Sequence, residues 1–208
     1  SASTAKDIKY ETDALRRFLR TLIGEGNPED RAALYAFNWQ TIQLSTFTRR
    51  LARLEDAIGR LKPEGGTSLY DAVTLAARDL EGRDGRHVMI MVTDGGDTTS
   101  GQRFSDAARA LQLADAVLYA ILVIPITNDA GRNIGGENAL ATLTAATGGR
   151  VFTPSPGPQL DAAFADILRD LRTQYFLGFY PRNIPYSNEK FHKVTATVIE
   201  TAKPESKP

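Results

Sequence analysis

Cysteine is absent from this chain of 208 residues, so the chain forms no disulfide and holds no metal ion through thiolates. The absence does not decide the compartment, because many secreted bacterial domains also lack cysteine. Histidine is nearly absent too: His87 and His192 are the only two, which leaves few candidates for a general base.

Long apolar runs and a net charge are also missing. No run approaches the roughly 18 residues that span a bilayer, and no signal-like segment opens the chain, so this segment is not expected to insert into a membrane. The 25 basic residues balance 25 acidic ones without a dense basic block, which argues against nucleic-acid binding. With 42% hydrophobic and 24% charged residues, the composition is that of a globular chain. Its length suits one α/β domain, or one domain plus a short appendage.

Apolar spacing predicts the elements of the first half. Residues 6–23 indicate an amphipathic helix that ends near Gly24 and Gly26. Arg31–Phe37 and Thr41–Phe47 are β-rich runs whose short separation permits only a hairpin. Two further apolar stripes, over residues 51–61 and 69–80, predict helices on either side of a loop at 63–67.

The second half alternates between strands and helices. Residues 88–92 and 117–124 are continuously apolar, which is typical of parallel strands covered on both faces. Helices are predicted at 105–116, 139–146 and 160–171, and a short strand at 151–153. This alternation predicts a Rossmann-like, doubly wound, mostly parallel sheet with one antiparallel edge strand.

The C-terminal part differs in character. Residues 175–180 and 191–199 are strand-like runs joined by a Pro/Asn/Ser-rich stretch, which predicts a β-hairpin or edge extension. The predicted division is therefore a domain at 1–173, an extension at 174–200 and a disordered tail at 201–208.

Three predicted loops carry hydroxyls and carboxylates. Residues 93–99, with Asp94 and Asp97, directly follow a buried strand, whereas residues 65–68 and 1–4 each precede a helix. In an open α/β sheet, ligands bind where the carboxyl ends of strands meet helix N-termini. Hydroxyl and carboxylate oxygens are hard ligands that suit Mg²⁺, Mn²⁺ or Ca²⁺.

These loops, in this order, resemble the von Willebrand factor type A (VWA) family, and the closing residues 174–180 and 191–199 resemble its bacterial, acidobacterial-type subgroup. The metal-ion-dependent adhesion site (MIDAS) of that family uses an Asp-x-Ser-x-Ser motif, a Thr in a Gly-rich loop and an Asp after a later strand. Ser1 and Ser3 match the two serines, Thr67 matches the threonine and Asp94 matches the aspartate. The resemblance covers nearly the whole chain.

The resemblance implies a binding module rather than an enzyme. Ser1, Ser3, Thr67 and Asp94 would hold Mg²⁺, or else Mn²⁺ or Ca²⁺, with Asp97 and Ser68 beside these ligands. The ion would take an Asp or Glu carboxylate of a protein partner, and Trp39, Arg132 and Asn133 are candidates for the surrounding contacts. The family also favours a periplasmic or secreted location, although the sequence itself leaves localisation open.

One element of the family pattern is not among these residues. The aspartate that opens the first motif, and the central strand that carries it, would lie before Ser1. Because the sequence begins without Met, we expect it to be a processed product or a fragment. The alternative is a fold that borrows the strand from a neighbour.

Three other interpretations stay open at this stage. Thr67 and Ser68 precede a helix, and Ser68 with Asp71 fits a capping box, so helix capping explains both without a metal. A metal-free scaffold or assembly module is a second alternative. A metal-dependent hydrolase built on Asp94 and Asp97 is a third, although the sequence lacks a Gly-x-Ser-x-Gly elbow and the lysine of a phosphate-binding loop.

Overall fold

The computed structural model of the chain describes residues 8–62, 64–93, 95–123, 133–155, 158–173 and 197. The elements in this part are α1 (Ile8–Glu25), β1 (Ala32–Phe37), β2 (Thr41–Thr48), α2 (Leu51–Gly59), α3 (Leu69–Leu80), β3 (His87–Thr93), α4 (Phe104–Leu113), β4 (Ala116–Leu122), α5 (Ile134–Ala146), β5 (Val151–Phe152) and α6 (Pro158–Thr173). Ser1–Gln174 form one compact unit and Tyr175–Pro208 a second. Apart from residue 197, the predicted hairpin at 174–200 and the tail at 201–208 lie outside the described residues.

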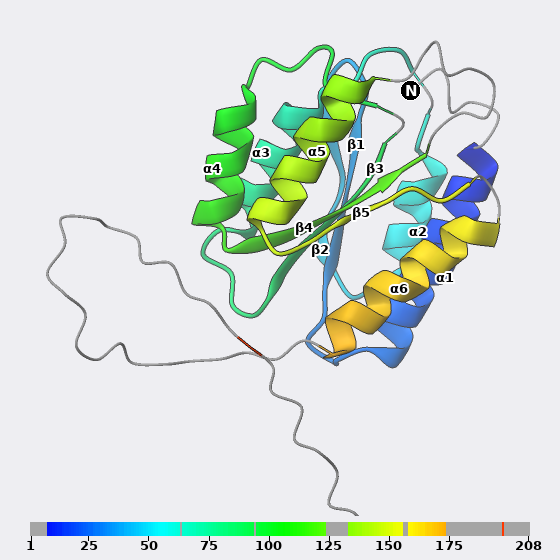
Figure 1. Ribbon diagram of the computed structural model, residues 1–208. Helices are drawn as coiled ribbons and strands as arrows, with labels where there is room; N and C mark the ends of the chain where they lie inside the picture. Colours follow the sequence, from blue (N-terminus) through cyan, green and yellow to red (C-terminus); the bar gives the residue numbers. More distant parts are fainter. Residues whose placement is uncertain are drawn as a thin grey trace, which may run out of the picture. The chain divides into compact units, whose positions relative to one another are not determined.

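The parallel sheet has the order β3–β4–β5, and the alternation of strand and helix confirms the predicted α/β class (Figure 1). β4 lies in the middle, and six of its seven residues are buried. Its side chains alternate between the two faces, so Leu118 and Ala120 enter one core while Tyr119 and Ile121 enter the other. A continuously apolar strand is therefore explained by helices on both sides of it.

Two helical layers cover the sheet. α3, α4 and α5 contribute Val73, Leu111 and Leu140 to the core on one face. α1, α2 and α6 contribute residues such as Phe18 and Phe164 to the core on the other. Figure 1 shows the two groups of helices on opposite sides of the strands.

The hairpin β1–β2 is antiparallel, as predicted. Among the described residues no backbone ladder joins β1 to β3, so the sheet is in two parts. Leu34 of β1 nevertheless shares a core with Ile90 of β3, and Tyr35 packs against the core that contains Met91. β1 and β3 thus contribute side chains to the same two cores. The central strand that the family resemblance implies would lie between them.

Two boundaries differ from the predicted ones for local reasons. α5 begins at Ile134 rather than near 139, because the Asn133 side chain caps a first turn that contains Gly135 and Gly136. Because a glycine-rich turn lacks helical apolar spacing, the sequence pattern does not predict this first turn of α5. α4 ends before Ala116 because Asp115 adopts a positive φ of 47°, which a helix cannot continue.

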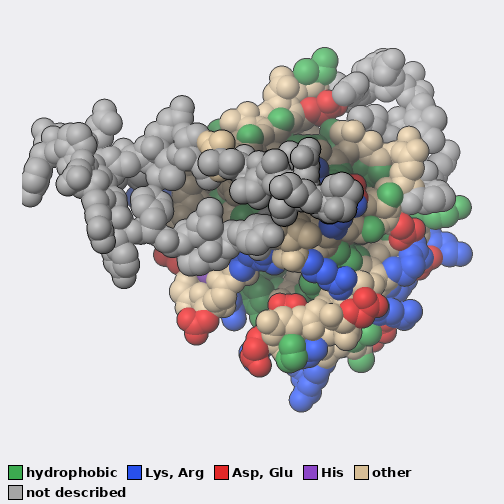
Figure 2. Space-filling view, turned by 60° about the horizontal axis from the view of Figure 1, so that its bottom comes forward, with side chains coloured by type: hydrophobic (Ala, Val, Ile, Leu, Met, Phe, Trp, Pro, Cys, Tyr) green, Lys and Arg blue, Asp and Glu red, His purple; other side chains and the backbone are tan. Residues whose placement is uncertain are grey.

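The surface carries mixed charges. Basic and acidic side chains are interspersed on the face seen in Figure 2. Several form ion pairs, and Arg17 of α1 bonds Asp161 of α6 at 2.8 Å. Within the described ranges, no helix is both long and apolar enough to cross a membrane.

Candidate functional site

The predicted site residues divide into two sets. The structure describes Thr67, Ser68, Asp97, Trp39 and Asn133. The others, Ser1, Ser3, Asp94 and Arg132, lie outside the described residues. The described part of the site therefore consists of the loop at 64–68, the loop at 95–102 and the turn between β1 and β2.

Thr67 is held by its backbone and buried. Its N–H donates to the hydroxyl of Thr98 at 2.8 Å, and its carbonyl accepts the N–H of Thr98 at 2.8 Å. The side chain is only 8% exposed, yet no hydrogen bond links its hydroxyl to any described residue. Two hydrogen bonds therefore fix the backbone of Thr67, while its hydroxyl makes none with the described residues.

Ser68 occupies the N-cap position of α3, but the predicted capping box is wrong. The Ser68 hydroxyl makes no cap hydrogen bond and lies 3.0 Å from the hydroxyl of Thr41. Its N–H donates to the carbonyl of Asn38 at 2.6 Å. Ser68 therefore ties the start of α3 to the β1–β2 hairpin, and the helix N-terminus is capped from elsewhere.

Asp97 supplies that cap from the loop after β3. Its carboxylate accepts the N–H of Leu69 at 2.8 Å and that of Tyr70 at 3.3 Å, the first two N–H groups of α3. It also accepts a hydrogen bond from the hydroxyl of Ser100. Burial, followed by the charge of Asp97, raises the pKa of the Tyr70 hydroxyl. A negative charge beside a helix N-terminus is favourable, so Asp97 stabilises this arrangement electrostatically as well.

Asp71 completes a reciprocal clamp that sequence patterns did not reveal. From the first turn of α3, its carboxylate accepts the N–H groups of Gly101 at 3.0 Å and Gln102 at 2.8 Å. Its own N–H donates to the Ser100 hydroxyl at 3.1 Å. The spacing of Ser68 and Asp71 predicts a local capping box, but Asp71 bonds to residues about 30 positions away. Contacts over such a distance leave no short-range pattern in the sequence. Together, Asp97 and Asp71 lock the loop after β3 onto α3.

The start of this loop is shaped by Thr93. The Thr93 hydroxyl donates to the carbonyl of Gly95 at 3.0 Å and accepts the N–H of Gly95 at 3.3 Å. Asp94 stands between these two residues in the sequence, so both neighbours of the predicted metal ligand are held in a tight turn. Asp94 itself lies outside the described residues.

Trp39 and Asn133 have different surroundings. Trp39, in the β1–β2 turn, is 58% exposed, and its backbone packs against Gly66, next to Thr67. Gly66 has a positive φ of 79°, and an added Cβ there would lie 3.0 Å from the Trp39 Cα. Asn133 accepts the N–H of Gly136 at 2.9 Å and so caps α5. Trp39 is thus an exposed neighbour of the Thr67 loop, and Asn133 has a structural bond of its own.

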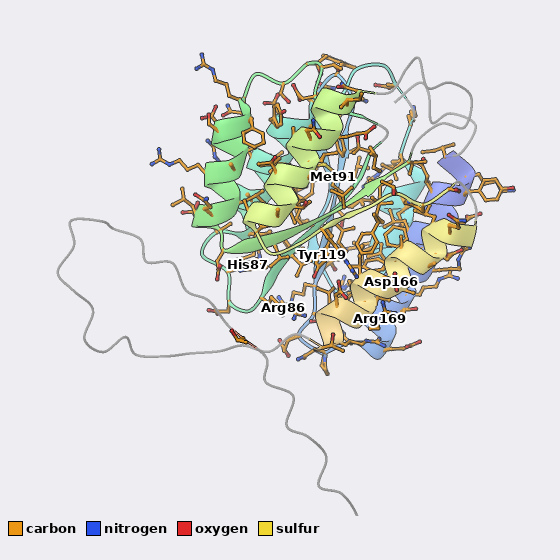
Figure 3. All side chains as sticks on the ribbon, viewed as in Figure 1. Arg86, His87, Met91, Tyr119, Asp166 and Arg169 are labelled. Atoms are coloured by element: carbon orange, nitrogen blue, oxygen red, sulfur yellow. The ribbon has the colours of Figure 1, made fainter. Side chains whose placement is uncertain are left out.

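In the described part of the chain, acidic and histidine side chains do not gather into a metal cluster. Among the residues that the structure describes, no group of three or more His, Cys, Asp or Glu side chains could hold an ion. The predicted ligand set is mostly hydroxyls, and Thr67 is its one described member. His87 lies at the end of β3 opposite to Thr93, where its ring contacts the carbonyls of Ala114 and Arg83 (Figure 3). These contacts give the histidine a structural role.

Comparisons with known proteins agree with this fold. Residues 1–97 match the family model of the von Willebrand factor type A domain. The vWF domain of the type V pili tip protein Mfa5 from Porphyromonas gingivalis has a similar structure, with a TM-score of 0.64, 15% identity, and coverage of 87% of this chain and 95% of that one.

Two further solved structures share the fold. BatB from Bacteroides thetaiotaomicron has a TM-score of 0.60 at 15% identity, over 84% of this chain and 95% of its own. The VWA domain of SpRpn10 has a TM-score of 0.55 at 16% identity, over 76% of this chain and 82% of its own. No curated protein sequence matches significantly. The acidobacterial-type subgroup stays a prediction. Residues 1–97 are thus similar to the von Willebrand factor type A domain, and the chain shares its fold with solved structures of such domains.

Proposed function

We propose that this domain binds a protein partner through a divalent cation, Mg²⁺ in the first place, held by Ser1, Ser3, Thr67 and Asp94. The VWA family is one of protein-interaction modules, which gives the general role. The cation and the carboxylate that it takes from the partner are the specific content of the proposal.

The position of Thr67 carries the argument. Thr67 is 8% exposed, and its hydroxyl bonds to none of the described residues. The backbone of Thr67 is held at both its N–H and its carbonyl, and this fixes where the side chain begins. A hydroxyl that is held in place and left without a protein partner is suited to ligate a hard cation.

The charge of the ligand set indicates what the ion would bind. Three neutral hydroxyls and the single carboxylate of Asp94 leave a divalent ion with net positive charge. Such an ion, when bound, supplies an electrostatic contact for an outside anion, and an Asp or Glu side chain of a partner provides one. Trp39, exposed beside the Thr67 loop, offers an apolar contact for the same partner, and Arg132 and Asn133 remain candidates for polar ones.

The hydrogen bonds of the Asp97 carboxylate favour binding over catalysis. A hydrolase built on Asp94 and Asp97 would need the Asp97 carboxylate for an ion or for water. Instead, that carboxylate accepts two helix N–H groups and the Ser100 hydroxyl. These three bonds go to Oδ1, and Oδ2 accepts the N–H of Ser100 at 3.4 Å, so the carboxylate already serves to hold the loop.

Thermal unfolding with and without Mg²⁺ tests the proposal. A ligand that binds only the folded state stabilises it by about 2.7 kcal/mol at 100 times its Kd, so we expect a higher midpoint in Mg²⁺. Thr67→Val and Asp94→Ala should lose most of this rise. Thr74→Val is the matched control, because Thr74 is also a buried threonine whose hydroxyl has no partner, yet it lies within α3. This control should keep the full response.

Two outcomes would contradict the proposal. A folded protein with no Mg²⁺, Mn²⁺ or Ca²⁺ response would favour the metal-free scaffold. A response that survives in both Thr67→Val and Asp94→Ala would show that the ion binds elsewhere. Acetate serves as the simplest carboxylate probe. It should raise the midpoint of thermal unfolding further in the presence of Mg²⁺ and should have no such effect without it.

A further inference from the structure

The loop after β3 touches the first turn of α5 through two glycines. A Cβ added at Gly96 would lie 2.5 Å from the Cα of Gly136 and 3.2 Å from its nitrogen. A Cβ added at Gly136 would in turn meet the Cα and nitrogen of Gly96. Both residues are buried. The two backbones are therefore in direct contact, and neither position has room for a side chain.

The loop side of this contact is part of the proposed cation site. Gly96 follows Gly95, whose N–H and carbonyl are bonded to the Thr93 hydroxyl. It precedes Asp97, which is anchored on α3. Gly96 is joined through the backbone to residues 93–95 on one side and to Asp97 on the other, so a displacement of Gly96 is passed on to both, and Asp94 belongs to the first of these segments.

The α5 side cannot easily retreat. Leu140 and Leu143 of α5 are 0% and 1% exposed, and both belong to the core under α3, α4 and α5. The first turn is closed by the Asn133 cap, in which the side chain accepts the Gly136 N–H at 2.9 Å. Moving the helix away would open space in a packed core, which is costly. An added methyl group therefore acts mainly on the loop.

We propose that Gly136 is a positioning residue for the cation site. Through backbone contact with Gly96, the first turn of α5 sets the place of the loop that carries Asp94. The inference rests on the proposed function, because it assigns α5 a part in cation affinity. It also makes a structural claim, the mechanical coupling of α5 to this loop, that can be tested without any ion.

Gly136→Ala and Gly135→Ala form a matched pair for the test. The two glycines are adjacent in the same helical turn, so alanine changes helix propensity similarly at both. A Cβ at Gly135 meets only the Asn133 side chain, at an ordinary 3.5 Å. Gly96→Ala and Gly95→Ala are a second pair, since a Cβ at Gly95 has nothing within 4 Å. The second pair serves if Gly136→Ala does not fold.

The first measurement is the Mg²⁺ affinity obtained from the midpoint shift. We expect Gly136→Ala and Gly96→Ala to weaken it by about tenfold or more, as is usual when the groups that orient metal ligands are disturbed. Gly135→Ala should stay within about twofold of the parent. Equal affinities in Gly136→Ala and Gly135→Ala would overturn the proposal.

The second measurement is amide hydrogen exchange in metal-free protein. The N–H groups of Thr98 and Leu69 report on the loop, because they bond the Thr67 carbonyl and the Asp97 carboxylate. They should exchange faster in Gly136→Ala than in Gly135→Ala, and equal rates would refute the coupling. If the parent does not respond to Mg²⁺, the proposed function fails, while the exchange data still decide whether α5 positions the loop.

Discussion

Buried hydroxyl groups in the described part of the chain differ in whether they have partners. Thr144 donates to the carbonyl of Ala141 at 3.1 Å, and Thr93 bonds to Gly95. The hydroxyl of Thr74 is buried without a partner. The hydroxyl of Thr67 bonds to none of the described residues. Only Thr67 lies at loops that suit a cation, so the hydroxyl of Thr74 is a simple cost to stability.

Thr74→Val should therefore stabilise the protein. Valine has nearly the same shape, and it removes a polar group that is buried without a partner at 3% exposure. We expect a gain of about 1 kcal/mol in the free energy of unfolding, measured by urea denaturation. Thr144→Val is the control, because it removes a hydroxyl that is hydrogen-bonded, and it should destabilise. A loss of stability in Thr74→Val would mean that its hydroxyl has a partner after all.

Asp97→Ala should destabilise the protein through α3. The substitution leaves the N–H groups of Leu69 and Tyr70 without their acceptor. Loss of a helix cap costs about 0.5–2 kcal/mol, and loss of the contact with the start of α3 adds to this. Asp97→Asn should cost less, because its amide oxygen still accepts. Chemical denaturation of the two variants side by side provides the measurement, and equal losses would argue that charge rather than hydrogen bonding dominates.

Tyr35 should make stability depend on pH in the alkaline range. Burial, and then its hydrogen bond to Asp79, raise the pKa of the Tyr35 hydroxyl above its ordinary value of 10.0. Because the folded state holds this proton more tightly, the stabilisation is complete below about pH 10 and is lost as the pH rises further. Tyr35→Phe should show a smaller fall in stability above pH 10 than the parent. Parallel pH profiles of the two proteins would contradict this.

Among the elements, β4, α5 and β5 are joined by short and specific contacts. Gly149, in the connection from α5 to β5, lies against the carbonyl of Leu118 in β4, where an added Cβ would clash. Next to it, the Thr147 hydroxyl accepts the N–H of Leu118 at 3.0 Å. This junction sets the position of α5 on the sheet and therefore also that of Gly136.

Gly149→Ala should destabilise this junction. The methyl group would meet backbone atoms of a central strand, which cannot rotate away as a side chain could. Overpacking of this kind costs about 1–3 kcal/mol, which thermal or urea unfolding would measure. Gly24→Ala is the control: Gly24 lies in α1 with nothing near its Cβ position, so alanine should be neutral or slightly stabilising there. Similar effects at both glycines would show that the Leu118 contact is unimportant.

For the compact unit Ser1–Gln174 as a whole, the two parts of the sheet depend on each other. No ladder joins β1 to β3 among the described residues, so the link between the parts is side-chain packing in the two shared cores. Core packing of this extent usually makes unfolding cooperative. The hairpin should therefore not melt before the helices.

Trp39 allows this cooperativity to be measured. It is the single tryptophan, and it lies in the β1–β2 turn, so its fluorescence reports on the hairpin. Far-UV circular dichroism reports mainly on the helices. We expect the two denaturation curves to coincide, because Leu34, Tyr35 and Phe37 pack in the same cores as β3 and β4. A fluorescence transition at lower denaturant would show that the hairpin is a separate folding unit.

The sequence by itself determined the order and type of the elements, the hairpin, and the polar loops that carry Thr67 and Asp94, whose role as ligands is what the family resemblance implies. These follow from local chemistry: apolar periodicity, the buried strand at 88–92, and polar residues directly after a strand or before a helix. What the sequence implied about Ser1, Ser3, Asp94 and Arg132 stays a prediction, since they lie outside the described residues.

Only the tertiary structure decided how the loops are held. It showed that Asp97 rather than Ser68 caps α3, that Asp71 holds the loop after β3, and that Gly96 touches Gly136. These contacts join residues about 30 to 40 positions apart, and no periodicity within one element encodes them. They depend on which surfaces the cores bring together, and that is settled only when both helical layers pack on the sheet.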